Sequence, residues 1–262
     1  MKNGYPMENL ALTDKHVVVT GGGTGIGAAI AAALATDGAR ITVMGRRLKP
    51  LESTAATLKD ARCVPCDVTD PASTEVAFEQ ARAGLGPIEI LVNNAGAAAT
   101  APFHTMDIEH WRRMLAVNLD GVFNCTRSVY EDMRTRGWGR IVNVASTAAV
   151  KGYAYVSAYC AAKHGVLGLT RALALEAAQS GVTVNAVCPG YTDTEIVRDA
   201  IKNIVKKTGR SADEALAELT RDNPQGRLIK PSEVADTVVW LCRPESASIT
   251  GQSIVVAGGE VM

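Results

Sequence analysis

The sequence predicts an α/β protein in which a parallel sheet of about seven strands carries helices on both faces. Short β-branched runs such as 16–20, 40–45 and 88–92 alternate with longer alanine- and leucine-rich segments that favour helix. This alternation continues along the whole chain, which is the pattern of a doubly wound parallel sheet. No repeat, low-complexity tract or break in composition divides the chain, so we expect a single domain spanning 1–262.

The composition argues against several classes of protein. Lys and Arg together number 27, as do Asp and Glu, so the formal net charge is zero. A neutral chain gives no electrostatic reason to bind nucleic acid or an anionic membrane surface. No apolar stretch approaches the roughly 20 residues of a spanning helix, and residues 1–14 lack the apolar core of a secretory signal. We therefore expect a soluble, cytoplasmic protein whose six cysteines are free thiols.

A glycine-rich turn lies between the first expected strand, 16–20, and a helix expected over 28–35. It consists of Gly21, Gly22, Gly23, Thr24, Gly25, Ile26 and Gly27. Such a turn lets backbone N–H groups approach a phosphate at the positive end of a helix. The spacing differs from the common G-x-G-x-x-G fingerprint, and a merely tight turn is the alternative to a dinucleotide site.

The second expected strand, 40–45, ends in Arg46 and Arg47. NAD enzymes usually carry Asp or Glu near this point for the ribose 2′-hydroxyl. Two guanidinium groups and no carboxylate favour a 2′-phosphate instead, because the guanidinium fork binds phosphate bidentately. We therefore expect NADP(H), with NAD(H) possible if the two arginines are only solvated.

The later elements follow the same alternation. We expect helices over 49–59, 71–83, 107–136 and 159–179, and strands over 62–66, 88–92, 139–145, 182–188 and 253–256. Small or polar residues follow several of these strands, namely Asp67-Val68, Asn93-Asn94-Ala95-Gly96, Ser146 and Pro189-Gly190. Because the carboxyl ends of parallel strands form the ligand crevice of an open sheet, we expect these residues to lie together.

Tyr159 and Lys163 are four residues apart in a stretch rich in helix formers, so both side chains should lie on one helix face. An ammonium beside a phenol favours the phenolate and should lower the phenol pKa from about 10. A proton donor nearer neutrality suits the reduction of a carbonyl. A chance surface pair is the alternative for these two residues taken alone.

Together these motifs resemble the short-chain dehydrogenase/reductase family over essentially the whole chain. The resemblance rests on Thr20 to Gly27, Asp67, Asn93 to Gly96, Asn118, Ser146, Tyr159, Lys163 and Pro189-Gly190. It implies a Rossmann-like fold and an enzyme that interconverts a ketone and a secondary alcohol with NAD(P)(H).

The resemblance also implies roles for single residues. Tyr159 would be the general acid in reduction, and Ser146 would polarise the substrate carbonyl. Lys163 would lower the Tyr159 pKa and bind the nicotinamide ribose, while Asn118 would hold a water in a relay to Lys163. The residues expected at the cofactor are Gly21, Thr24, Gly25, Ile26, Gly27, Arg46, Arg47, Asp67, Val68, Asn94, Ala95, Gly96, Tyr159, Lys163, Pro189, Gly190, Thr192 and Thr194.

A segment at about 194–230 should form a lid over the substrate, with one helix over 196–205 and a second after Ser211. It carries Arg198, Lys202, Lys206, Lys207 and Arg210. These cations are either a basic rim for the phosphates of a coenzyme A or carrier-protein thioester, or a solvated helix face. The segment 139–197 most resembles the 3-oxoacyl-thioester and polyketide ketoreductase branch, so a small ketone or such a thioester is the expected substrate.

Two alternatives remain open from the sequence. One is an NAD-dependent dehydrogenase of a degradative pathway, and the other is a dinucleotide sensor without turnover. The resemblance also implies a homotetramer in which helices 107–136 and 159–179 pair between subunits. The histidines have no metal-ligand spacing and Cys63 and Cys66 have no second pair, so no metal is expected.

Overall fold

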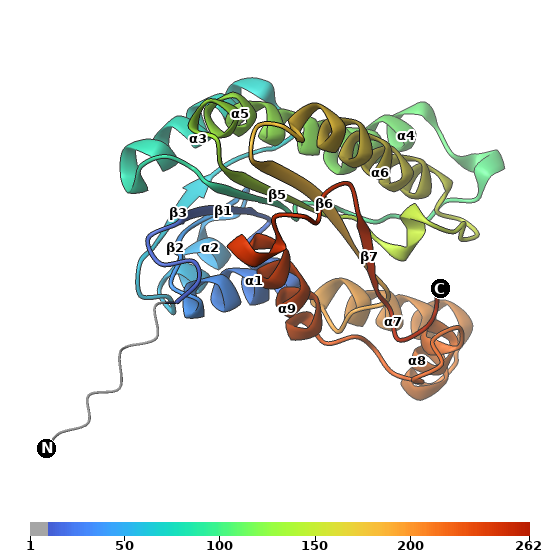
Figure 1. The fold of residues 1–262 in the computed structure, drawn as a ribbon. Coiled ribbons are helices and arrows are strands. Elements are labelled where there is room, and N and C mark those ends of the chain that lie inside the picture. The colour runs from blue at the N-terminus through green and yellow to red at the C-terminus, as the bar shows by residue number, and fades with distance from the viewer. Residues whose placement is uncertain (1–9) are drawn as a thin grey trace, which may run out of the picture.

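A seven-stranded parallel sheet forms the centre of the molecule (Figure 1). This computed structural model describes residues 10–262 apart from the side chain of Lys207; the expectations for residues 1–9 and for Lys207 in the basic rim lie outside the described residues. The strands are β1 (His16–Thr20), β2 (Arg40–Gly45), β3 (Ala61–Pro65), β4 (Ile90–Asn93), β5 (Gly139–Val144), β6 (Val182–Pro189) and β7 (Ser253–Val256). They lie in the order β3-β2-β1-β4-β5-β6-β7, so the predicted fold is confirmed.

Two helical layers cover the sheet (Figure 1). The long helices are α1 (Gly25–Thr36), α2 (Leu48–Ala55), α3 (Pro71–Leu85), α4 (Ile108–Leu115), α5 (Gly121–Arg136), α6 (Ser157–Ala177), α7 (Glu195–Thr208), α8 (Ala212–Thr220) and α9 (Pro231–Cys242). Side chains alternate along a strand, so Val17 and Val19 join the core under α1 and α9, whereas Val18 joins the core under α3, α5 and α6. Burial on both faces explains why the strands read as continuous apolar runs.

The strand order places a crevice between β1 and β4. The chain runs from β1 through β2 to β3 on one side of the sheet and then returns to β4 on the other side of β1. At such a switch point the loops that follow the two strands diverge and leave room for a ligand. Within residues 10–262, no helix is both long and apolar enough to cross a membrane.

Two predicted helices were wrong in extent. The helix expected over 107–136 is divided into α4 and α5 by a π-helical turn, η2 (Ala116–Asp120). Gly121 follows this turn and packs on Val68, whose Cγ2 would lie 2.7 Å from a Cβ at that position. The helix expected over 49–59 ends at Ala55, because Thr57 and Leu58 donate tighter i→i+3 hydrogen bonds to Thr54 and Ala55.

The segment 194–230, which we call the lid segment, contains the two expected helices, α7 and α8. Ser211 caps α8 as predicted: its hydroxyl accepts from the Glu214 N–H at 3.2 Å, and the Glu214 carboxylate accepts from the Ser211 N–H at 2.7 Å. Figure 1 shows the C-terminus ending beside α7 and α8, which are separated from it in the sequence by α9 and β7.

A buried histidine at the start of β1 should make stability depend on pH. His16 Nδ1 contacts the Gly86 carbonyl at 2.8 Å and Nε2 contacts the Thr42 hydroxyl at 2.8 Å. Burial lowers the pKa of His16 below its usual 6.5, so the folded protein holds it neutral while the unfolded chain takes up a proton. The contribution of the neutral His16 to the stability of the fold is therefore fully present above about pH 6.5. This contribution is lost as the pH falls below that value.

We expect the Tm measured by calorimetry to fall between pH 7.5 and 5.5, and His16→Gln to flatten this slope. His104→Gln, at an exposed position on η1 (Phe103–Thr105), is the matched control and should keep the wild-type slope. An unchanged slope in His16→Gln would show that other groups set the pH dependence.

Candidate active site

Ser146, Tyr159 and Lys163 meet at the carboxyl ends of β5 and β6. Ser146 follows β5 and caps the short helix η3 (Thr147–Ala149), where its Oγ accepts from the Ala148 N–H at 3.1 Å. Tyr159 and Lys163 occupy the first two turns of α6, with the Lys163 ammonium 5.8 Å from the centre of the Tyr159 ring. The three residue types expected for carbonyl chemistry thus lie at one end of the sheet.

Burial controls the protonation of this pair. Burial raises the pKa of Tyr159, and the neighbouring Ser146 hydroxyl opposes this rise only in part. Burial also lowers the pKa of Lys163 to about 8. Its Nζ donates to the Val144 carbonyl at 2.8 Å, which fixes the ammonium against the end of β5.

The expectation that Lys163 lowers the pKa of Tyr159 was therefore wrong for this structure. Desolvation of the phenolate exceeds every other influence on the phenol, and the ammonium is itself desolvated and bonded to a carbonyl. The consequence is a phenol that keeps its proton at neutral pH.

Asn118 lies in the π-helical turn and is fully buried. Its Nδ2 donates to the carbonyls of Ala97 at 2.8 Å and Met114 at 3.0 Å, and its Oδ1 accepts from the Ala97 N–H at 3.2 Å. A Cβ on Gly96 would lie 2.8 Å from this Oδ1 and 3.7 Å from Lys163 Nζ. The side chain thus ties the loop after β4 to the helix.

The glycine-rich turn forms a cradle at the switch point. The Asn94 Nδ2 donates to the carbonyls of Thr20 at 3.0 Å and Gly21 at 3.2 Å. The Thr20 hydroxyl accepts from the N–H groups of Asn94 and Ala95, both at 3.0 Å. A Cβ on Gly27 would run into the Gly21 carbonyl and the Asn94 amide. Glycine at position 27 therefore lets the start of α1 pack closely on the Gly21 carbonyl and Asn94, and a glycine-rich turn of this kind suits a pyrophosphate group.

The start of α1 is open toward this cradle. Thr24 is the N-cap but its side chain makes no capping hydrogen bond, and the first turn, which includes Gly25 and Ile26, holds no acidic residue. The first N–H groups of a helix lack intrahelical partners and attract anions. Together with the glycine cradle, this end of α1 suits the phosphates of a dinucleotide.

Arg46 and Arg47 lie exposed at the end of β2, where a ribose 2′-phosphate would be expected. Asp67 accepts from the Thr69 N–H at 3.0 Å and the Thr69 hydroxyl at 2.8 Å. Burial raises the pKa of Asp67, but these bonds and the charge of Arg46 outweigh it and leave the pKa below its usual value. Val68 is buried, and the ionised Asp67 beside it is held by its two bonds to Thr69.

The turn after β6 closes the other end of the crevice. Pro189 ends the strand, and Gly190 donates its N–H to the Val256 carbonyl at 3.0 Å. The buried Thr192 hydroxyl donates to the Gly190 carbonyl at 3.0 Å. The Thr194 methyl would lie 3.2 Å from a Cβ on Gly25, so the turn reaches the glycine cradle.

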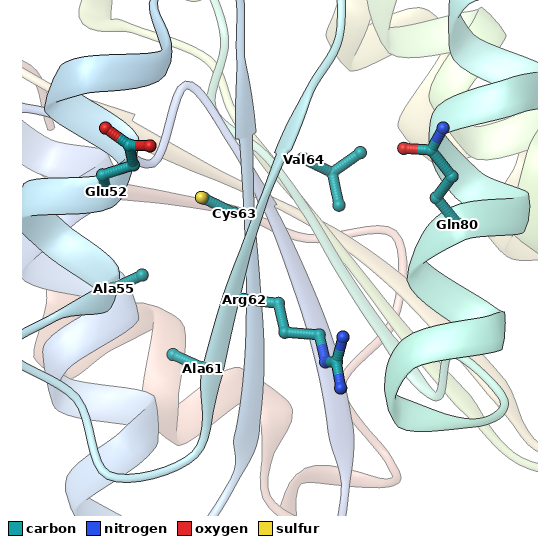
Figure 2. Close-up of a pocket in the computed structure, with 7 residues that line it drawn as sticks. All are labelled: Glu52, Ala55, Ala61, Arg62, Cys63, Val64 and Gln80. Carbon is teal, nitrogen blue, oxygen red and sulfur yellow. The ribbon is translucent and has the colours of Figure 1, made fainter.

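A second hollow lies elsewhere on the molecule. A cleft of about 450 Å³ lies at the outer strand β3. Figure 2 shows the residues of α2, β3 and α3 that line it, among them Glu52, Arg62 and Gln80. None of the predicted site residues lines it. Among the described residues no group of three or more His, Cys, Asp or Glu side chains could hold a metal ion, and burial raises the pKa of the Cys66 thiol to about 11.

Four residues beside the predicted site were missed. Lys151, Tyr153 and Tyr191 follow the strands that carry Ser146 and Gly190, and Glu260 lies in the turn after β7. The only available signal was position: each of the four follows the carboxyl end of a strand.

A parallel sheet with an open glycine cradle at its switch point and a serine, a tyrosine and a lysine at the same edge defines a dinucleotide-dependent oxidoreductase. The chain matches the family model for short chain dehydrogenases over residues 15–204. It belongs to that family, and it is an enzyme that acts on ketone and alcohol groups rather than a sensor without turnover.

Relatives of known name support this placement over nearly the whole chain. The chain is 39% identical over 246 residues to an acetoacetyl-CoA reductase of Rhizobium meliloti (strain 1021), covering 93% of this chain and 97% of the relative. It is 35% identical over 252 residues to a D-beta-hydroxybutyrate dehydrogenase of the same organism, covering 94% and 98%. A crystal structure of an actinorhodin polyketide ketoreductase variant with NADPH shares 37% identity and a TM-score of 0.91, covering 95% of this chain and 98% of that chain.

Proposed function

We propose that this protein reduces a 3-oxoacyl thioester or a related ketone to the secondary alcohol with NADPH. The observation that carries the proposal is the meeting of Ser146, Tyr159 and Lys163 at the crevice that begins with the glycine cradle and Arg46. Support comes from two relatives, one named for reduction of acetoacetyl-CoA and one a polyketide ketoreductase crystallised with NADPH.

The residues present divide the chemistry between them. NADPH, when bound, supplies the hydride. Ser146 donates a hydrogen bond to the substrate carbonyl oxygen, where negative charge develops. Tyr159 transfers its proton to the same oxygen, and its raised pKa keeps that proton available at neutral pH. Lys163 holds a positive charge beneath the phenol, and this charge is lost as pH rises through about 8.

Initial rates of acetoacetyl-CoA reduction, measured side by side with NADPH and NADH, test the proposal. Consumption of the reduced nicotinamide is followed by absorbance. Rapid turnover that favours NADPH is the expected result. Turnover that favours NADH would instead support the alternative of a degradative NAD-dependent dehydrogenase. The 35% identity with a D-beta-hydroxybutyrate dehydrogenase is the observation that favours this alternative. No turnover with either cofactor would remove the thioester as substrate.

Arg46 is the residue most directly placed to select NADPH. We expect Arg46→Ala to raise the KM for NADPH by about tenfold, the effect of losing one charge-assisted hydrogen bond to phosphate. The KM for NADH should change less than about twofold, because NADH has no 2′-phosphate. Arg136→Ala, at another exposed arginine at the end of α5, is the matched control. Equal losses with both cofactors would show that Arg46 does not recognise the 2′-phosphate.

The cations of the lid segment give little support to a basic rim. Arg198 pairs with Asp193 at 3.0 Å, Lys202 pairs with Asp199 at 2.9 Å, and Arg210 lies 3.8 Å from Glu218. These carboxylates offset the charge that a coenzyme A phosphate would need. We therefore base the proposed thioester substrate on the residues of the catalytic site and on the relatives. The whole chain forms one domain, in which the lid segment, at about 194–230, covers the substrate.

We propose further that the enzyme is a cytoplasmic homotetramer. All six cysteines are free thiols, as expected in a reducing compartment. Leu175 on α6 is 81% exposed and Phe123 on α5 is 51% exposed, which suits helices that pair between subunits. Light scattering should give a tetramer for the wild type and a smaller species for Leu175→Glu. Leu48→Glu, at a leucine 45% exposed on α2, should remain tetrameric; a wild-type monomer would contradict the proposal.

A further inference from the structure

A buried carboxylate near the C-terminus joins three segments that surround the catalytic serine. Glu260 follows β7, and its side chain is only 4% exposed. Its Oε1 accepts from Lys151 Nζ at 3.1 Å and from the Tyr153 hydroxyl. Its Oε2 would lie 2.8 Å from a Cβ on Gly190. The carboxylate is therefore enclosed between the segment after Ser146 and the turn after β6.

The first connection runs from Glu260 to the segment that carries Ser146. Tyr153 Oη also bonds the Thr147 hydroxyl at 2.6 Å, and Thr147 is buried directly after Ser146. A carboxylate can only accept, so the single Tyr153 proton goes to Glu260 and the Thr147 hydroxyl donates to Tyr153. Burial and the bond to Glu260 raise the pKa of Tyr153, which keeps this proton in place.

The second connection runs from Glu260 to the end of the lid segment. Lys151 lies 3.5 Å from Asp222, which follows α8, as well as 3.1 Å from Glu260. A Cβ on Gly258 would run into the Asn223 side chain, and a Cβ on Gly259 would lie 3.2 Å from Pro224. The C-terminal turn therefore packs directly on residues 222–224, where the lid segment turns back to the body of the enzyme.

We propose that Glu260 is a positioning residue that couples the lid segment to the catalytic serine, with Tyr153 as the link to Ser146 and Lys151 as the link to the lid. The inference rests on the proposed function for its kinetic consequences only. A buried carboxylate with two bonded partners holds a narrow range of positions. Movement of the lid end is thereby transmitted through Lys151 and Glu260 to Tyr153 and Thr147.

The two links predict separable effects. Tyr153→Phe removes the bond to Thr147 and Glu260, so it should lower kcat with a smaller effect on KM. Lys151→Met removes the link to Asp222, so it should raise KM and make the lid segment more accessible to proteases. Glu260→Ala removes the bonds to Tyr153 and Lys151 but leaves Lys151 beside Asp222, and it should lower kcat by about tenfold to a hundredfold, the cost of small errors in position at a reacting centre.

Limited trypsin digestion of the full-length enzyme tests the lid without any substrate. The lid offers exposed cleavage sites at Lys202, Lys206 and Arg210. Glu260→Ala and Lys151→Met should speed cleavage at these sites by about fivefold or more, whereas Tyr153→Phe should not. Glu260→Gln, which keeps the shape of the side chain, should fall between wild type and Glu260→Ala. Glu79→Ala, at an exposed glutamate on α3, is the matched control.

Two results would overturn the proposal. One is a Glu260→Ala enzyme with wild-type lid cleavage and wild-type kcat. The other is faster cleavage at the lid and equally faster cleavage at Arg62 on β3, with a matching loss of Tm, because that would be general destabilisation. A wild-type enzyme that does not reduce acetoacetyl-CoA would overturn the proposed function, and the comparison of lid cleavage would still decide the role of Glu260.

Discussion

Replacing Tyr159 by phenylalanine should lower kcat for ketone reduction by about 10²- to 10⁴-fold, the usual contribution of a positioned general acid. The change removes one oxygen and leaves the ring beneath which Lys163 lies. The cradle of Gly21, Gly25 and Gly27 is untouched, so the Kd for NADPH, measured by nicotinamide fluorescence, should stay within about twofold, well below the tenfold that 1.4 kcal/mol represents.

Tyr130→Phe on α5 provides the matched control, because Tyr130 packs in the core beneath α3, α5 and α6 and lies outside the site. It should keep wild-type kcat. If Tyr159→Phe retained turnover, another group would have to supply the proton, and Tyr159 would not be the general acid.

The fold could be predicted because its signals are local. β1 is a β-branched run, Val17 to Val19, and α1 after it is alanine-rich, and the alternation of such apolar runs with helical segments predicts a parallel sheet. The site residues could be located for a related reason. Gly190 directly follows β6 and Ser146 lies two residues after β5, and the carboxyl ends of parallel strands share one edge.

What the sequence did not predict depends on burial and on distant contacts. The spacing of Tyr159 and Lys163 predicts their proximity but not the desolvation that raises the phenol pKa. The π-helical turn around Asn118 depends on two bonds to Ala97, which lies 21 residues earlier. Glu260 depends on Lys151 and Tyr153, more than 100 residues away, so no short window of sequence contains its role.

Replacing Gly27 by alanine should damage the cofactor site and the fold together. The added methyl would meet the Gly21 carbonyl and the Asn94 amide, and both of these are fixed by the hydrogen bonds between Asn94, Thr20 and Gly21. We expect the free energy of unfolding to fall by about 1–3 kcal/mol, the range for an overpacked site. The Kd for NADPH should rise by about tenfold or more, because the cradle must open to admit the methyl.

Gly152→Ala is the matched control, since no atom lies within 4 Å of a Cβ at that position. It should leave both the Kd for NADPH and the stability unchanged. The two readouts separate the physical roles of Gly27. A lower Tm with an unchanged Kd would mean that the glycine serves packing between α1 and the loop after β4. A higher Kd at an unchanged Tm would mean that the cradle is held open for phosphate, and that its shape was set by the cofactor rather than by the fold.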